Sequence, residues 1–165
     1  MDYISYYQSP LGQMLLAAKG DALSGVWFEG QKYYGSTLAK VYEEKNVPIL
    51  EQTKDWLNIY FQGENPDFMP HMIWIGSSFQ KDVWRSLMEI PYGNVTTYGE
   101  IGNKLAKERG VARMAARAVG TAVGHNPISI LVPCHRVVGV NGKLTGYAGG
   151  IDRKAALLMM EHEKM

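Results

Sequence analysis

Short apolar runs separated by turn-forming residues make up the first 30 residues of the chain. The runs cover residues 3–7, 13–18 and 23–28. The segments between them, residues 9–12 and 19–21, contain the proline, glycine, serine and aspartate that favour turns. The pattern therefore predicts three strands joined as a β-hairpin or a small meander.

Apolar side chains recur every three or four residues from residue 48 to residue 61, which is the spacing of one helical face. Pro48 suits the first helical position, where a missing N–H costs nothing. Residues 62–66 would end the helix, and residues 62–77, rich in Gly, Pro and Ser, indicate a linker. No convergent acid, base or metal-binding set stands out here, and His71 is interpreted as an ordinary loop histidine.

A helix is predicted to begin after Ser77, because Gln80 follows three residues later in the pattern of a capping box. Its ending is marked by the turn-forming residues 91–94. The apolar residues expected on its buried face are Phe79, Val83, Trp84, Leu87 and Met88.

Thr97 and Glu100 repeat the capping-box pattern and predict a helix over about residues 98–108. Gly110 breaks it, and a further helix is predicted over about residues 112–123. Two short helices joined by a tight glycine-containing turn in a basic region indicate a helix-turn-helix.

The second of these helices has an unusual composition, with Arg117 as a long cation among small residues. Such a surface suits either close packing against another helix or close approach to a DNA backbone or narrow groove. Proteins that read the major groove need long polar side chains to reach base edges. The composition therefore argues against sequence-specific binding. The small residues are Ala112, Ala115, Ala116, Ala118, Gly120, Thr121, Ala122 and Gly124.

Composition narrows the class of protein. The 165 residues are 46% hydrophobic and 20% charged, as is ordinary for a globular protein. A single cysteine excludes an internal disulfide and a cysteine-cluster zinc site, and it fits a reducing compartment. No apolar run is long enough to cross a membrane, and the N-terminus lacks the features of a signal peptide. We therefore expect a cytoplasmic protein without membrane contact.

The net charge of +1 hides an asymmetry between the two halves. Residues 1–77 contain 5 Lys or Arg and 9 Asp or Glu, a net charge of −4. Residues 78–165 contain 12 Lys or Arg and 7 Asp or Glu, a net charge of +5. The second half is the part suited to face a polyanion, although a surplus of this size is also common in proteins that bind none.

The single cysteine, Cys134, lies in the apolar run of residues 130–138. This run is interpreted as a short buried strand that stops at Pro133, because proline cannot donate to a sheet ladder. A lone cysteine in such a run is most often a small core residue. Here, however, His135 and Arg136 follow it, and positive neighbours lower the pKa of a thiol and favour the nucleophilic thiolate.

Five short motifs lie between about Phe79 and Glu161. They are Ile90-Pro91-Tyr92-Gly93, Ala116-Arg117-Ala118-Val119-Gly120, Asn126-Pro127, Pro133-Cys134-His135-Arg136-Val137 and Gly146-Tyr147-Ala148-Gly149-Gly150. Together these motifs resemble those of the O6-alkylguanine-DNA alkyltransferase family. The resemblance is highly specific, because all of the motifs occur together and in order.

This resemblance implies an α/β (α+β) fold in two domains. Residues 1–75 would form a small mixed domain of ribonuclease-H-like type with a supporting role. Residues 76–165 would form a mainly helical domain with a winged helix-turn-helix, which binds DNA and transfers the alkyl group. Relative to shorter members, residues 107–110 carry an insertion that lengthens the helix-turn-helix connection.

The activity that the resemblance implies is DNA repair by a single-turnover methylated-DNA–[protein]-cysteine S-methyltransferase. The alkyl group of O6-alkylguanine, and by extension O4-alkylthymine, would move to Cys134. His135 would draw the thiol proton through a water, and a glutamate on a C-terminal helix over about residues 153–163 would orient it. In the family this glutamate lies three residues after a Leu-Leu pair, and Leu157-Leu158 therefore favours Glu161, with Glu163 as the alternative. No cofactor and no metal are implied.

By the same resemblance, Arg117 would fill the gap left by the extruded base. Tyr98 would act on the adjacent phosphate and on N3 of the flipped guanine. Ala118 and Gly120 would lie against the minor groove, and Asn126 would be a hinge residue. The pocket would be formed by the carbonyls of Cys134 and Val137, the ring of Tyr147 and the amide of Ala148, where some relatives have serine. The expected partner is duplex DNA containing O6-alkylguanine, bound by a monomer; whether binding is cooperative is left open.

Three other functions compete with this interpretation. A non-catalytic alkyltransferase-like protein would recognise the lesion without removing it, but such proteins lack the cysteine. A Cys-His hydrolase using Glu161 would need an oxyanion hole and has no use for a helix-turn-helix. A transcription factor would need long polar side chains on its second helix.

Overall fold

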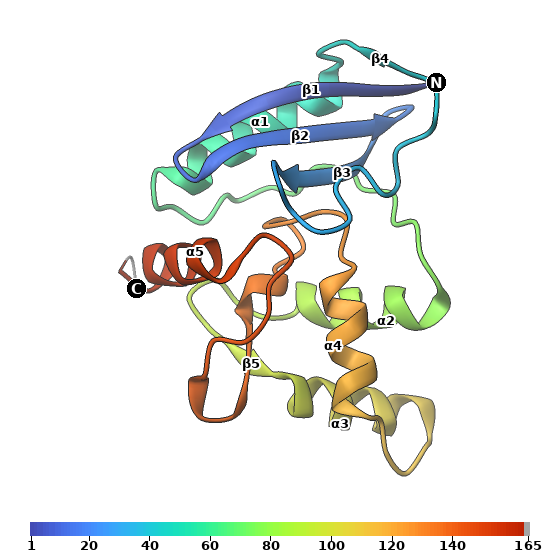
Figure 1. Ribbon diagram of the computed structural model, residues 1–165, viewed down its shortest axis with the longest axis vertical. Coiled ribbons are helices and arrows are strands. Elements are labelled where there is room, and N and C mark those ends of the chain that lie inside the picture. The colour runs from blue at the N-terminus through green and yellow to red at the C-terminus, as the bar shows by residue number, and fades with distance from the viewer. Residues whose placement is uncertain (164–165) are drawn as a thin grey trace. The chain divides into compact units, whose positions relative to one another are not determined.

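The structure is a computed structural model that describes residues 1–163 (Figure 1). Its residues group into two compact units. The first consists of Met1–Ile75 and Pro127–Leu131, and the second contains Gly76–Asn126 and Val132–Glu163. The first unit is built on a β-sheet and the second is mainly helical. The expected α+β fold class is therefore confirmed.

The sheet of the first unit has four strands in the order β3-β2-β1-β4. Strands β1, β2 and β3 form the predicted antiparallel meander, and β4 pairs in parallel with β1. Helix α1 packs against the first three strands, as Figure 1 shows. The bounds are Asp2–Ser9 for β1, Gly12–Lys19 for β2, Ala22–Phe28 for β3, Tyr42–Glu44 for β4 and Pro48–Phe61 for α1.

Burial explains why these elements form where they do. Every residue of β3 is buried, and helix α1 buries one face against the sheet. The segment Pro127–Leu131 runs beside β3: the amide of Val26 donates to the carbonyl of Pro127 at 2.9 Å, and the amide of Ser129 donates back to Val26 at 3.0 Å. These bonds anchor the chain just before the cysteine motif. The buried residues of α1 are Ile49, Leu50, Thr53, Trp56, Leu57 and Tyr60.

In the second unit, helices α2, α3 and α4 pack against one another. The indole of Trp84 is almost fully buried and donates to the carbonyl of Ala122 at 2.9 Å, which ties α2 to α4. Two short strands, β5 and β6, pair in parallel. The bounds are Ser78–Met88 for α2, Thr96–Thr97 for β5, Tyr98–Arg109 for α3, Ala116–Gly124 for α4, Val137–Val138 for β6 and Ile151–Glu163 for α5, and short 3-10 turns cover Cys134–Arg136 and Val140–Gly142.

The two predicted capping boxes differ in outcome. Ser77 and Gln80 form both reciprocal hydrogen bonds. Thr97 accepts from the amide of Glu100 as expected, but the Glu100 carboxylate accepts from the hydroxyl of Thr96 instead of closing the box. Both helices nevertheless begin at the predicted position. Within residues 1–163, every helix is too short or too polar to cross a lipid bilayer.

The prediction for the second helix of the pair is wrong at its start. Helix α4 begins at Ala116 and not near residue 112, because Ala115 has extended dihedral angles and no side chain caps the helix. Gly110 ends α3 in the left-handed conformation with φ of 67°, so a non-helical connection joins the two helices. An alanine-rich segment predicts helix by propensity but carries no capping side chain to fix where the helix starts.

The strand predicted over residues 130–132 is also wrong. These residues form turns, and Ile130 has a left-handed φ of 71°. Their side chains are buried as expected, but among residues 1–163 no strand pairs with them. The carbonyl of Val132 accepts from the side chain of Asn126 and from the amide of Cys134, which closes a tight turn directly before the cysteine.

Candidate active site

Cys134 is the first residue of a 3-10 turn and lies almost wholly inside the second unit. The cysteine is 4% exposed. The side chain of Asn126 hydrogen-bonds the thiol and also donates to the carbonyl of Val132 at 2.8 Å. Asn126 therefore joins the end of α4 to the turn that presents the thiol.

His135 and Glu161 form a close buried pair. Nε2 of His135 lies 2.6 Å from Oε2 of Glu161, and the two side chains are 0% and 1% exposed. Glu163, the alternative candidate, lies exposed at the end of α5. Of the two carboxylates, the structure thus brings Glu161 to the histidine.

Arg136 is a third member of this cluster that the sequence did not reveal. Its Nε donates to Oε1 of Glu161 at 2.8 Å, and a terminal nitrogen donates to Oε2 at 3.2 Å. The other terminal nitrogen donates to the carbonyl of Ile90 at 2.8 Å. The amide of Gly93 also donates to Oε1 of Glu161 at 3.2 Å. The turn at residues 90–93 and the guanidinium together hold the carboxylate in place.

These contacts set the protonation states of the pair. Burial acts to raise the pKa of Glu161, but hydrogen bonds from His135 and Arg136 outweigh it and lower this pKa to about 2. Burial lowers the pKa of His135 more than the Glu161 carboxylate raises it. The pair is therefore a carboxylate and a neutral imidazole near pH 7. Nε2–H then donates to Glu161, and Nδ1 is the basic nitrogen of the ring.

The thiol behaves differently from the sequence-based expectation. Burial raises the pKa of Cys134 to about 11, although the Asn126 hydrogen bond and the charge of Lys154 act to lower it. The expectation that His135 and Arg136 lower this pKa is wrong. His135 is neutral, and Arg136 is engaged by the Glu161 carboxylate. Although these two residues follow the cysteine directly in the sequence, neither stabilises the thiolate with a positive charge.

Lys154 is a second buried charged residue that the sequence motifs did not reveal. The spacing of residues in α5 could have indicated that Lys154 is buried. Lys154, Leu157 and Glu161 are separated by three and four residues and therefore share one face of the helix, and all three are buried. Two charged residues on the buried face of a helix are rare unless they have a structural or chemical role.

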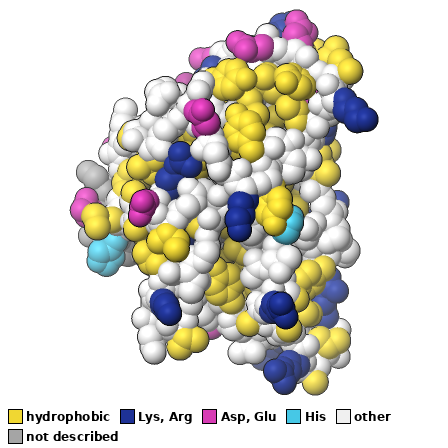
Figure 2. All heavy atoms as spheres, in the orientation of Figure 1, with side chains coloured by type: hydrophobic (Ala, Val, Ile, Leu, Met, Phe, Trp, Pro, Cys, Tyr) yellow, Lys and Arg dark blue, Asp and Glu magenta, His cyan; other side chains and the backbone are white. Residues whose placement is uncertain are grey.

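The residues expected to contact DNA lie on exposed parts of α3 and α4. Arg117 and Ala118 are exposed in the first turn of α4, and Tyr98, the first residue of α3, is half-buried. A Cβ added at Gly120 would lie 3.7 Å from the Tyr98 ring, so the two residues are neighbours. On the face shown in Figure 2, the part built from these helices carries Lys and Arg side chains and almost no Asp or Glu.

Of the expected pocket residues, Val137 precedes the glycine-rich loop of residues 146–150, whereas Tyr147 and Ala148 lie within it. Val137 is fully buried in β6, whereas Tyr147 and Ala148 are half-buried in an irregular segment. The phenol of Tyr98 donates to the carbonyl of Gly146 at 3.4 Å and accepts from the hydroxyl of Thr145 at 3.4 Å. The candidate base-contacting tyrosine is thereby connected to the loop expected to hold the base.

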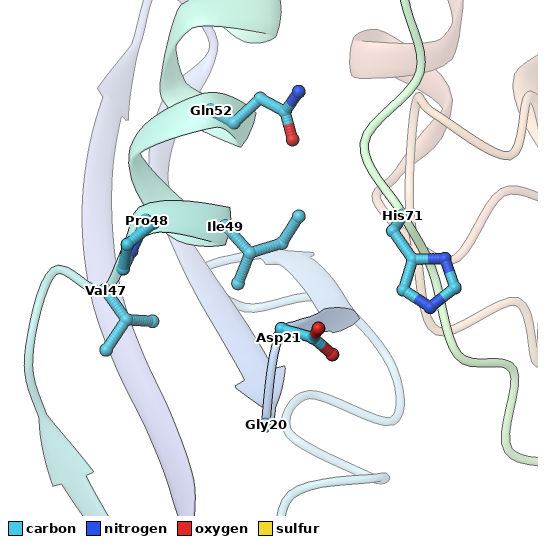
Figure 3. A pocket seen from close by; sticks show the side chains of 7 residues that line it. All are labelled: Gly20, Asp21, Val47, Pro48, Ile49, Gln52 and His71. Atoms are coloured by element: carbon cyan, nitrogen blue, oxygen red, sulfur yellow. The ribbon is translucent and has the colours of Figure 1, made fainter.

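A separate surface pocket of about 640 Å³ lies in the first unit (Figure 3). Its polar side chains are Asp21 and Gln52, with His71 standing opposite them. Its lining contains no thiol or hydroxyl side chain. Over residues 1–163, no cluster of three or more His, Cys, Asp or Glu side chains could hold a metal ion.

The buried pair predicts how stability depends on pH. In the unfolded chain His135 takes up a proton below about pH 6.5 and Glu161 below about pH 4.5, whereas in the folded chain both pKa values are lower. The unfolded state thus binds more protons across this range, so stability falls as pH drops from 6.5, and the Glu161 contribution disappears near pH 2. Urea unfolding at a series of pH values measures this loss.

His162→Gln alters an exposed histidine and is the control: the free energy of unfolding should depend on pH as it does in the wild-type protein. A free energy of unfolding that is constant between neutral and acid pH would contradict the protonation states assigned to His135 and Glu161.

Comparison with known proteins matches both parts of the chain to one family. Residues 78–163 match the family described as 6-O-methylguanine DNA methyltransferase, DNA binding domain. Residues 3–69 match the family described as 6-O-methylguanine DNA methyltransferase, ribonuclease-like domain. Together the two matches include nearly every element of both units.

Individual relatives agree over almost the full chain. The methylated-DNA–protein-cysteine methyltransferase of Mycobacterium bovis is 44% identical over 156 residues, which is 94% of this chain and 90% of the relative. The enzyme of the same name from Methanosarcina acetivorans is 42% identical over 160 residues, or 96% and 97% of the two chains. The crystal structure of Mycobacterium tuberculosis OGT in complex with DNA has a TM-score of 0.85 at 42% identity, covering 98% of this chain and 94% of that one. The chain therefore belongs to the 6-O-methylguanine DNA methyltransferase family.

Proposed function

We propose that this chain repairs DNA by moving the alkyl group of an O6-alkylguanine onto the sulfur of Cys134, once per molecule. Its relatives are named methylated-DNA–protein-cysteine methyltransferases, and one similar structure contains DNA. The observation that carries the proposal is the buried contact of 2.6 Å between His135 and Glu161, directly after the single cysteine. This arrangement supplies a base where a nucleophile needs one.

The proposed reaction begins with proton transfer from the thiol to Nδ1 of His135 through a bridging water. Glu161, ionised and bound to Nε2–H, stabilises the imidazolium that forms. The thiolate attacks the alkyl carbon, so an S–C bond forms as the C–O6 bond breaks. The electron pair of the broken bond stays on the guanine, which takes up a proton. The thioether is stable, and Cys134 is consumed.

Delivery of the base requires its extrusion from the duplex, because O6 of a stacked guanine is out of reach of a buried thiol. In this proposal Arg117 occupies the gap in the stack, and Ala118 and Gly120 allow the backbone of α4 to approach the minor groove. Tyr98 acts on the neighbouring phosphate and on N3 of the flipped guanine. The exposure of Arg117 and Ala118 and the proximity of the Tyr98 ring to Gly120 support these roles.

The extruded guanine would be held by backbone groups and one ring. The carbonyls of Cys134 and Val137 would accept from its exocyclic amine, the amide of Ala148 would donate to O6, and Tyr147 would stack on the alkyl group. Asn126 keeps the thiol turn in register through its bonds to Cys134 and Val132. Backbone recognition tolerates alanine at position 148 as well as serine.

The proposal assigns the two parts of the chain different tasks. Residues 76–165 bind DNA and transfer the alkyl group, and residues 1–75 support them. The cytoplasm is the proposed location, because a reducing compartment keeps the single cysteine as a thiol. The protein would act as a monomer on duplex DNA.

The test is the intact mass of the protein, with peptide mapping, after mixing with a duplex that contains one O6-methylguanine. We expect a stoichiometric gain of one methyl group on the Cys134 peptide. Cys134→Ser should gain none while still binding the duplex. Tight binding by the wild-type protein without any mass change would instead make it a lesion-recognition protein and reject the transfer.

A further inference from the structure

The end of helix α3 carries residues that the proposed transfer reaction does not use. Residues 107–110, where the family resemblance implies an insertion, form the last turn of α3 and the glycine that ends it. The amide of Val111 donates to the carbonyl of Ala106 at 2.9 Å and closes this helix end. From there a mostly exposed connection, residues 110–115, leads to α4 and Arg117 (Figure 1).

Arg109, the last residue of α3, is bound to helix α2 through Asp82. Its Nε and one terminal nitrogen donate to the same carboxylate oxygen of Asp82, at 3.1 and 2.6 Å. Its guanidinium also lies over the ring of Phe79, 5.3 Å from the ring centre. Arg85, one turn further along α2, donates to the other carboxylate oxygen at 2.8 Å. The hydrogen bonds from Arg109 and Arg85 lower the pKa of Asp82, so this carboxylate is charged at neutral pH.

Helix α4 depends on such an anchor because no side chain caps its first turn. Its N-cap is Ala115, which can accept no hydrogen bond through its side chain. Just before it, the carbonyl of Met114 lies against α3: a Cβ added at Gly102 would come within 3.1 Å of this oxygen. The connection is therefore anchored at both ends, by Arg109 where it begins and by Met114 where it finishes. Arg117 follows three residues after the second anchor.

An exposed arginine in the basic half of the chain would ordinarily be assigned to a DNA phosphate. In Arg109, however, two of the three guanidinium nitrogens donate to Asp82. The side chains of Asp82 and Arg109 are 30% and 36% exposed, so both are partly shielded from water. An ion pair that belongs to a network of charges is worth more than an isolated surface pair. The geometry thus favours an internal role for this arginine.

We propose that the ion pair of Asp82 and Arg109 is a latch that positions the connection between α3 and α4, and through it Arg117, for base extrusion. The inference rests on the proposed function and gives a role to the insertion that the resemblance implies at residues 107–110. Asp82 and Arg109 are positioning residues, which act through Arg117 and not by contact with the thiol. Without the latch the first turn of α4 moves more freely, so Arg117 enters the duplex less often in the productive orientation.

Two variants break the latch, and two matched controls leave it intact. Asp82→Ala and Arg109→Ala each remove one partner. Glu89→Ala and Lys104→Ala each remove one partner of a second ion pair, which joins the end of α2 to the middle of α3. Each control changes the net charge by the same amount as the variant it matches. A general electrostatic effect on DNA binding would therefore appear in both.

The first measurement is hydrogen exchange in the DNA-free protein, followed by NMR. The reporters are the amides of Val111 and Val119, which are hydrogen-bonded on either side of the connection. Both should exchange about threefold to fivefold faster in Asp82→Ala and in Arg109→Ala, and at the wild-type rate in the two controls. The double variant should exchange no faster than the single ones, because either change removes the whole pair. Unchanged exchange in both single variants would overturn the latch.

The second measurement is single-turnover methyl transfer at saturating DNA, from an O6-methylguanine in a duplex and in a single strand. Asp82→Ala and Arg109→Ala should both slow transfer from the duplex about threefold to fivefold and change transfer from the single strand little. Arg109→Lys keeps the charge but not the fork of donors, so its rate should lie between those of Arg109→Ala and wild type.

A phosphate contact by Arg109 predicts a different result. Loss of Arg109 would then weaken DNA binding, whereas Asp82→Ala would release the arginine and strengthen binding. The latch predicts changes of the same sign in the two variants, with DNA affinity within about twofold of each matched control. Changes of opposite sign would reject it.

The two measurements separate failure of this inference from failure of the proposed function. If the wild-type protein transfers no methyl group, the proposed function fails, and the exchange rates still decide whether Asp82 and Arg109 hold the connection. If transfer occurs but the latch variants lose duplex and single-strand rates equally, the proposed function stands and the positioning of Arg117 is rejected.

Discussion

Glu161→Gln is expected to slow methyl transfer by about a hundredfold or more and to destabilise the folded chain. The carboxylate accepts hydrogen bonds from His135, from two nitrogens of Arg136 and from the amide of Gly93. Glutamine is close in shape but neutral, so it cannot stabilise the imidazolium that forms when His135 takes the thiol proton. Its amide can also donate to Nε2, which would place the ring proton on Nδ1, the nitrogen needed as base.

The loss of stability has a separate cause. Arg136 is about nine-tenths buried and would keep its charge without an anionic partner. Breaking a buried ion pair from one side typically costs about 3 kcal/mol or more. Urea unfolding measures this loss, and single-turnover mass spectrometry with an O6-methylguanine duplex measures the rate.

Glu163→Gln is the matched control for this change. Glu163 lies two residues further along α5, carries the same charge and is exposed. It should leave both the rate and the free energy of unfolding near their wild-type values. Equal loss of rate in the two variants, or none in Glu161→Gln, would reject the proposed relay.

Arg117→Ala is expected to slow transfer from duplex DNA by about tenfold to a hundredfold. Arg117 is an exposed long side chain on the first turn of α4, where its neighbours Ala116 and Ala118 are small. Without it, no side chain at this position would compensate for the stacking that the extruded base loses, and unstacking costs a few kcal/mol. Transfer from an O6-methylguanine in a single strand should change little, because no duplex has to be opened.

The comparison that isolates this role uses Arg113→Ala. Arg113 is an exposed cation in the connection before α4. If it contacts only phosphate, its loss should weaken DNA binding and reduce the salt dependence for both substrates alike. Single-turnover rates at saturating DNA then distinguish the two variants. The same duplex-to-single-strand ratio in Arg117→Ala and in wild type would rule out a role in base extrusion.

Long elements with regular periodicity were predictable from sequence because their signals are local. Strands β1 to β3 and helices α1 and α2 all begin or end at turn residues, a proline or a capping box. The two- and three-residue strands β4, β5 and β6 are too short to show any period. These strands form because the backbone of another segment lies close enough to pair with them. Whether such a segment is available depends on tertiary contacts and cannot be read from a local pattern.

The turn that carries the cysteine shows the limit of pattern reasoning most clearly. The apolar residues 130–132 predict a strand, and their burial is correct. Their conformation is decided by the left-handed φ of Ile130 and by the Asn126 side chain that binds the carbonyl of Val132. A backbone bond to a side chain six residues earlier leaves no periodic trace in the sequence.

By itself the sequence contained the family motifs, and their resemblance implied the fold class. It also placed the single cysteine inside one of these motifs, because motif spacing and turn chemistry are local properties. Tertiary structure decided which charges act on one another. It joined Arg136 to Glu161, buried Lys154 behind the glycine-rich loop and raised the pKa of Cys134 to about 11. Electrostatic effects depend on distance and burial in space, and residues adjacent in sequence, such as Cys134 and Arg136, can direct their charges to different partners.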